Sequence, residues 1–294
     1  VVYGYGIPAA MFFWAARLFR EAAQKNLTAA LLVTLLEAGG LAFCVLLVSL
    51  QIRVLVAGAL GSTDYTLLEQ SLQSAAWLSV GTILAIHHRK RAHPVSLYGS
   101  RILLGAAMAQ VVLLQLGLSN PVLTREFVGD YPLVNLLFLA YAVPAAFALR
   151  LAVDLRGEVS RLPSGLFAGL GFVLVFTYLS LEVRRAFQGP VLSLFHQSDA
   201  EFYAYSLAWL VYAGVLLALG IYRRESALRY AFLVVLLITV VKVFIFDMAD
   251  STGLYRVASF LGLGLSLVGI GYLYQRFVFH QPAAQEPPEE AKPT

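Results

Sequence analysis

Acidic and basic residues gather among long apolar runs between Tyr178 and Arg256. An arginine guanidinium binds phosphate or carboxylate groups through paired hydrogen bonds, and a carboxylate beside it could serve as a general base. We interpret the set as one candidate substrate or partner cluster, and simple salt bridging among its members is the structural alternative. Its members are Glu182, Arg184, Arg185, Asp199, Glu201, Lys242, Asp247 and Arg256.

Lys242 is the most informative member because it lies inside an apolar run, five residues before Asp247. An ammonium group within a membrane span costs at least about 2.5 kcal/mol. Two interpretations are open: the side chain extends to the membrane interface, or it pairs with an acid. We predict that Lys242 lies inside the helical bundle with Glu201 or Glu182 as its partner.

Three residues share one face of the run that begins near Glu201. Glu201, Tyr205 and Trp209 are spaced four residues apart, so a helix brings them to the same side. One interpretation is an interfacial anchor, with the acid favoured by the helix dipole near the N-terminus. The other is a polar face that lines a cleft open to the outside.

Glu37 and Gln110 are polar residues within other apolar runs. Glu37 falls near the middle of its run, and a carboxylate at that depth is a functional candidate by default. The histidines of the loop that contains His93 lack cysteines or acids at ligand spacing, so we expect no metal site there. Nucleotide-binding and hydrolase motifs do not occur, so we expect no cofactor.

The composition is that of a membrane protein. Of 294 residues, 60% are hydrophobic and only 13% are charged, with a mean hydropathy of +0.76. So few charges cannot cover the surface of a soluble protein. The net charge of +4 sits in loops, so we expect no nucleic-acid partner. The expected partners are the lipid bilayer, anionic lipid headgroups or other membrane proteins of the cell envelope.

The apolar runs predict about nine membrane-spanning helices, because each approaches the ~20 residues that cross a bilayer. Most of the 21 Lys and Arg residues fall on alternate connections, which predicts that this side, with the C-terminus, is cytoplasmic. No charged n-region precedes the first run, so we expect no signal peptide and a chain that is part of something longer. The predicted spans are 1–18, 29–50, 70–87, 97–117, 133–151, 163–182, 202–221, 228–247 and 254–275.

Internal similarity indicates a repeat. Arg53 and Arg184 lie 131 positions apart within similar Ser-Leu-x-x-Arg segments, and a third match joins Tyr5 to Tyr141 at 136. An even number of spans per repeat makes the copies parallel. We therefore predict an all-α polytopic membrane bundle: residues 1–20 end a preceding repeat, 29–151 and 163–277 are two parallel four-span repeats, and 278–294 are a disordered cytoplasmic tail. The pairs 132 positions apart are Glu69 and Glu201, Ser74 and Ser206, Trp77 and Trp209, Gln110 and Lys242, and Gln115 and Asp247.

The C-terminal runs resemble the bacterial predicted membrane proteins grouped as domain of unknown function 2339. The most specific part is the segment from Lys242 to Asp247 followed by Gly253-Leu254-Tyr255-Arg256. The resemblance implies a long, many-spanned protein of the bacterial inner membrane and carries no established chemistry. Two functions stay open: an envelope transport or scaffold unit, or a membrane enzyme that acts on a lipid-linked phosphate with Asp199 or Glu201 as base.

Overall fold

The structure, a computed structural model, describes residues 1–61, 65–157, 162–192 and 198–244, with a few helical positions between 261 and 272. Within these ranges the chain is helical apart from its connections and a single isolated bridge between Phe127 and Val191. This confirms the all-α fold class. The predicted site residues Asp247 and Arg256, most of the ninth span and the tail lie outside the described residues.

Two compact units divide the chain, Val1–Glu201 and Phe202–Thr294, and each is described by itself. The first unit contains most of the helices. In chain order they are η1 (Val2–Gly6), α1 (Ile7–Leu18), α2 (Arg20–Ala23), α3 (Leu27–Ala57), α4 (Leu67–Arg91), α5 (Pro94–Gln110), η2 (Val111–Leu118), α6 (Pro121–Thr124), η3 (Phe138–Ala142), α7 (Val143–Asp154), η4 (Leu155–Gly157) and α8 (Leu162–Gln188). Then α9 (Asp199–Tyr222) starts at the unit boundary, and α10 (Ser226–Lys242) follows it.

Local signals explain where these helices begin and end. The Asn26 side chain caps α3 by accepting from the Thr28 N–H, and Thr66 caps α4 by accepting from the Glu69 N–H. Gly58 ends α3 with a φ of 72°, a left-handed conformation that glycine adopts without a Cβ penalty. Proline supplies the first turn of α5, where its missing N–H costs nothing.

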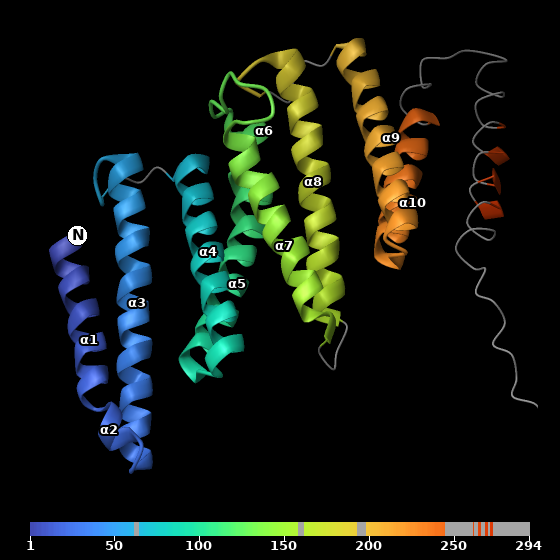
Figure 1. Ribbon diagram of the computed structural model, residues 1–294. Coiled ribbons are helices and arrows are strands. Elements are labelled where there is room, and N and C mark those ends of the chain that lie inside the picture. The colour runs from blue at the N-terminus through green and yellow to red at the C-terminus, as the bar shows by residue number, and fades with distance from the viewer. Residues whose placement is uncertain are drawn as a thin grey trace, which may run out of the picture. The chain divides into compact units, whose positions relative to one another are not determined.

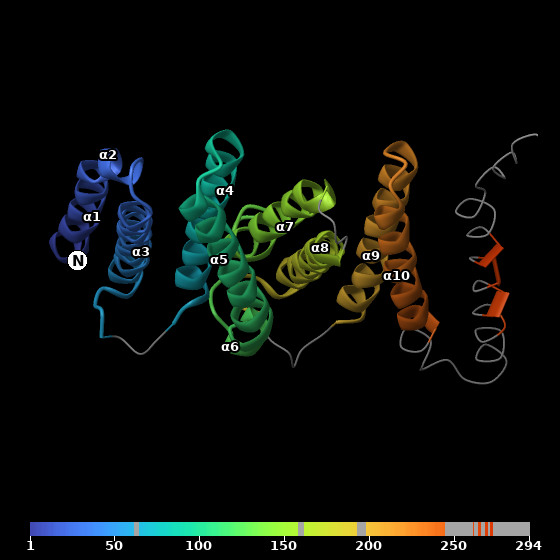
Figure 2. The same cartoon turned by 90° about the horizontal axis from the view of Figure 1, so that it is seen from below.

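Helices of the first unit pack in pairs, with α1 against α3, α4 against α5, and α7 against α8 (Figures 1 and 2). Small residues allow this close approach. A Cβ at Gly81 would lie 2.9 Å from Leu104 Cγ, and a Cβ at Gly171 would lie 2.6 Å from Leu149 Cγ. Tyr141 is fully buried where α4, η2 and α8 surround η3, and its hydroxyl donates to the Gln115 carbonyl at 2.6 Å.

In the second unit, α10 lies beside α9 (Figures 1 and 2). Gly220 near the end of α9 admits Arg229 of α10, whose Cγ would be 2.9 Å from a Cβ at that position. At the far end of α10, the Lys242 ammonium reaches the first turns of α9. The short connection between the helices therefore makes them antiparallel neighbours.

Four helices among the described residues are long and apolar enough to cross a membrane. This supports a membrane protein, while the prediction of nine spans stays a prediction. The observed helix ends differ from the predicted ones by a few residues, for example where span 133–151 becomes η3 and α7. The four helices are Leu27–Ala57, Pro94–Thr124, Pro163–Gln188 and Asp199–Tyr222.

Candidate functional site

One end of the first unit, where α3 and α8 end and α4 begins, carries buried ion pairs; we call it the acidic end. Both Arg53 Nη1 contacts to the Glu69 carboxylate are 2.9 Å, and the two side chains are 9% and 3% exposed. The Arg53 guanidinium also lies 4.0 Å above the Tyr65 ring. Such a charge-assisted contact fixes the end of α3 to the first turn of α4.

Arg185 and Glu182 form a second pair at the acidic end. Arg185 Nε donates to Glu182 at 3.0 Å, and Arg185 Nη1 donates to the Asp130 carbonyl at 3.1 Å. Glu182 also accepts from the Asn135 amide and, at 3.4 Å, from the Leu133 N–H. The pair therefore ties the connection after α6 to α8.

Glu201 forms the third group, and at 1% exposure it is the most buried of the predicted site residues that the structure describes. Gln188 Nε2 donates to its carboxylate at 3.1 and 3.3 Å, and Arg184 Nε lies 4.0 Å from it. Its own N–H donates to Ser198 Oγ at 3.2 Å. Asp199, two residues earlier, begins α9 and is exposed.

Lys242 is 8% exposed within the second unit, and its ammonium contacts α9. It donates to the Phe202 carbonyl at 2.9 Å and to Ser206 Oγ at 2.8 Å, and it lies 3.8 Å above the Phe202 ring. The side chain is thus directed into the helix pair. Its predicted pairing with Glu201 or Glu182 stays a prediction.

A buried amide network lies inside the first unit around Gln110. Gln110 Nε2 donates to the backbone carbonyl of Gln70 at 3.2 Å. Gln115 Nε2 donates to the same backbone carbonyl at 3.1 Å and to Ser74 Oγ at 2.8 Å. Gln70 Nε2 donates to Ser119 Oγ at 2.8 Å. Gln70 Oε1 and Gln115 Oε1 have no hydrogen-bond partner among the described residues. Gln70 was not predicted as a site residue from the sequence. It follows Glu69 at the start of an apolar run, where polar residues are expected at the membrane interface.

Glu37 is 7% exposed and has two basic partners from other elements. Arg20 Nη2 of α2 and His93 Nε2, at the start of α5, each lie 3.0 Å from its carboxylate. His93 was read only as a loop histidine, because nothing in the local sequence relates it to a residue of α3. Over the residues described here, no group of three or more His, Cys, Asp or Glu side chains could hold a metal ion.

The buried acids Glu69, Glu182, Glu201 and Glu37 each bond a basic or amide side chain of another element, so these contacts join neighbouring elements of the first unit. Buried charges of this kind are stable only when paired, and the long apolar helices around them suit a bilayer. The class is therefore that of an all-helical membrane protein.

The chain belongs to the family described as predicted membrane protein DUF2339, whose profile matches residues 2–277. The comparisons with curated proteins and with solved structures gave no match. Family membership therefore agrees with the class that the helices define, and it assigns no reaction to any of the buried groups.

Proposed function

We propose that this chain is a multi-pass scaffold unit of a bacterial inner membrane, with its C-terminus in the cytoplasm. One observation carries the proposal: among the described residues, the buried charges of the acidic end bind each other and hold separate elements together. Arg53 of α3 pairs with Glu69 of α4. Arg185 and Glu182 pair within α8 and bond the connection after α6 through the Asp130 carbonyl and the Asn135 amide. Because ion pairs in a low-dielectric setting are directional and costly to break, they hold helices in one arrangement.

Matching element boundaries support two parallel repeats as the basis of this scaffold. Helices α4 and α9 begin 132 positions apart, and so do α5 and α10, which also end 132 positions apart. The π-helix η1 and helix α1 have the same lengths as η3 and α7, at a spacing of 136. The left-handed residues Ala92 and Arg224, which follow α4 and α9, are again 132 apart.

Matching contacts add to this support. Arg53 and Glu69 in the first copy correspond to Arg184 and Glu201 in the second, and each arginine lies near its glutamate. Close glycine contacts also recur: Gly40 approaches Phe13, and Gly171, 131 positions later, approaches Leu149, which is 136 positions after Phe13. Two copies that share both boundaries and contacts fit a structural module more readily than a single catalytic centre.

Thiol accessibility tests the scaffold proposal in a chain whose Cys44 is replaced by alanine. We expect Ser74→Cys and Gln115→Cys to stay unlabelled by a small impermeant reagent from either side, because both positions are fully buried. As a control, Tyr131→Cys, at a position 77% exposed, should react in intact cells, and Arg91→Cys should react only after permeabilisation. Labelling of residues 74 and 115 would replace the scaffold with a transport path, and labelling of residue 91 in sealed cells would reverse the orientation.

Transport is the second candidate, and the amide network favours it. Two buried carbonyl oxygens without partners among the described residues, Gln70 Oε1 and Gln115 Oε1, are acceptors that a passing solute could use. The enzymatic alternative, with Asp199 or Glu201 as base on a lipid-linked phosphate, has less support. Glu201 is 1% exposed and already accepts from Gln188, whereas a general base must reach its substrate.

A further inference from the structure

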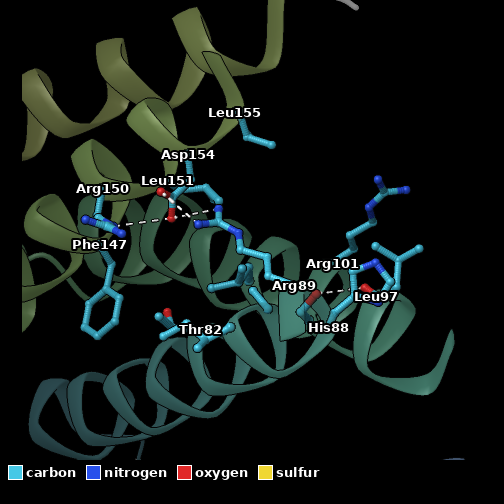
Figure 3. Close-up of a pocket in the computed structure, with 14 residues that line it drawn as sticks. Thr82, His88, Arg89, Leu97, Arg101, Phe147, Arg150, Leu151, Asp154 and Leu155 are labelled. Carbon is cyan, nitrogen blue, oxygen red and sulfur yellow. Dashed lines mark hydrogen bonds and ion pairs between the residues drawn. The ribbon is translucent and has the colours of Figure 1, made fainter. Parts of the chain in front are cut away.

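Two cavities of the first unit have very different linings. One, of about 410 Å³, opens between α4, α5 and α7, and Figure 3 shows its Arg89 and Arg150 directed at the Asp154 carboxylate, which they contact at 3.2 and 3.3 Å. The other, of about 570 Å³, lies along α3 and α5, and we call it the apolar groove. Thr34 and Tyr98 carry the only hydroxyl groups of its lining, and the other lining residues are aliphatic, alanine, glycine or proline. Its occupant is therefore apolar.

The walls of the apolar groove are two helices that run in the same direction. His93, which precedes α5, contacts Glu37 of α3 at 3.0 Å. Six residues further along the chain, a Cβ at Gly99 would lie 2.7 Å from Leu41 Cδ2, and Leu41 is four residues beyond Glu37. The contacts thus advance together along both helices. Small side chains in the lining, such as that of Ala42, leave the space between the walls open.

One end of the apolar groove is polar. Glu37 contacts both Arg20 and His93 there, and the Arg20 side chain is 66% exposed. The backbone that joins α4 to α5 at Ala92 and His93 is not helical. A connection of this kind lies outside the lipid-facing hydrocarbon region, where its backbone groups could not be hydrogen-bonded. This end of the groove therefore lies at the membrane interface, and the rest extends into the hydrocarbon core.

The length of the apolar groove distinguishes between two kinds of apolar occupant. Along α5 its lining runs from Pro94 to Leu103, and these residues lie about 14 Å apart on a helix. One leaflet contributes about 15 Å of hydrocarbon, half of a core ~30 Å thick. A lipid chain that enters at the interface fills a groove of this length from end to end. A membrane-spanning helix of a partner would need a groove about twice as long.

We propose that the apolar groove binds one acyl chain of a bilayer phospholipid, whose head group lies at the polar end beside Arg20 and Glu37. Its walls belong to two of the four helices that are long and apolar enough to cross a membrane, Leu27–Ala57 and Pro94–Thr124, so lipid has access to it. A chain that moves from the bilayer onto a protein gains no hydrophobic free energy. Dispersion contacts with two helices at once hold it instead, so binding depends on the shape of the groove.

Native mass spectrometry of the full chain, purified in detergent and washed free of lipid, tests the proposal with two probes. Palmitoyl-oleoyl phosphatidylglycerol and dihexanoyl phosphatidylglycerol share a head group and differ in chain length. We expect one equivalent of the long-chain lipid to bind saturably. The short-chain lipid should bind at least about tenfold more weakly, because its six-carbon chains leave the inner part of the groove without contacts. Equal binding of both probes would assign the affinity to the head group and overturn the proposal, as would no binding of either.

Variants separate the apolar groove from the rest of the lipid-facing surface. Ala42→Leu should weaken binding of the long-chain lipid at least about fivefold, because the larger side chain occupies space that the acyl chain needs. Ala106→Leu makes the same change at an exposed position of α5 outside the lining, and its affinity should stay within about twofold of the unmodified chain. Equal weakening by the two variants overturns the site.

A helix from a second copy of this chain is the competing occupant of the apolar groove. It would be detected in the same spectra as a dimer that binds no lipid and that Ala42→Leu converts to monomers, and this result overturns the proposal. Should Ala42→Leu not fold, Ala42→Val adds less volume at the same position and should weaken lipid binding by a smaller factor. Unchanged binding by Ala42→Val then overturns the proposal.

Discussion

Helix pairs α4–α5 of the first unit and α9–α10 of the second start 132 positions apart, yet different side chains fill their interiors. In the first pair, the side-chain amides of Gln110 and of Gln115, in the adjoining η2, donate to the backbone carbonyl of Gln70, and Gln115 also donates to Ser74. In the second pair, the single ammonium of Lys242 bonds the Phe202 carbonyl and Ser206, which are the equivalent acceptors at the same spacing.

The acceptors are thus backbone or serine oxygens in both pairs, whereas the donors differ in number and charge. The donor in each pair adds a bond between the helices, because a carbonyl inside a helix already accepts the N–H four residues further on. This added bond does not require a charged donor. The charge on Lys242 is therefore the part of the contact that architecture alone does not explain.

The largest loss of stability is expected from breaking the Arg53–Glu69 ion pair at the acidic end. Arg53→Met should lower the free energy of unfolding by about 3–5 kcal/mol, because it leaves the Glu69 carboxylate buried and uncompensated. Detergent-titrated unfolding monitored by circular dichroism measures the change. Arg53→Met combined with Glu69→Gln should recover part of it.

Arg20→Gln is the matched control for this prediction, because its ion pair with Glu37 is formed by an arginine that is 66% exposed. An exposed partner contributes about 0–1 kcal/mol, and Glu37 keeps its contact with His93. An effect of Arg20→Gln as large as that of Arg53→Met would show that burial does not set the strength of these pairs.

Composition and the length of the apolar runs predicted the all-α membrane fold class, because both depend on whether lipid or water surrounds the chain. The helical positions of Glu201 and Lys242 were also predicted from periodicity and polarity. The partners of Glu37 could not be predicted, because Arg20 and His93 approach it only after α2 and α5 pack against α3. In the sequence, Arg20 and His93 are ordinary basic residues of connecting segments.

A moderate effect is expected from closing the gap between α7 and α8. Gly171→Ala places a Cβ 2.6 Å from Leu149 Cγ and 3.3 Å from the Leu149 backbone N, so the helices must separate. Overpacking of this kind costs about 1–3 kcal/mol, measured by the same unfolding titration. Gly169→Ala is the control, because nothing lies within 4 Å of its Cβ, and it should be neutral or stabilising.

The equivalent position in the α1–α3 pair sharpens the comparison. For Gly40→Ala, the three atoms nearest the new Cβ all belong to the Phe13 ring, at 3.0–3.1 Å. A ring can shift by a few tenths of an ångström where a backbone atom cannot, so this variant should cost less than Gly171→Ala. The opposite order would mean that the two glycine contacts do not belong to equivalent interfaces.

The ion pair between Arg89 and Asp154 was not predicted for a different reason. Arg89 was interpreted as one of the loop charges that set membrane orientation, and that interpretation needs no structure. The pair forms only when α7 packs against α4, an interaction between helices more than 50 residues apart in sequence. Charge counting along the chain detects the excess of bases but not the carboxylate that Arg89 contacts.

The smallest effect is expected from exchanging the donors of the two helix pairs. Lys242→Gln keeps a donor for the Phe202 carbonyl and Ser206, as Gln110 and Gln115 do for the equivalent oxygens, so we expect a loss of less than about 1 kcal/mol. Lys242→Met removes the donor and leaves Ser206 without this contact, so it should cost more, about 1–3 kcal/mol. Unfolding titrations of both variants give the order.

If Lys242→Gln is as damaging as Lys242→Met, the charge itself is required, and the predicted carboxylate partner becomes the explanation. Combining each variant with Glu201→Gln then tests that partner, because only a true ion pair restores stability when both charges are removed.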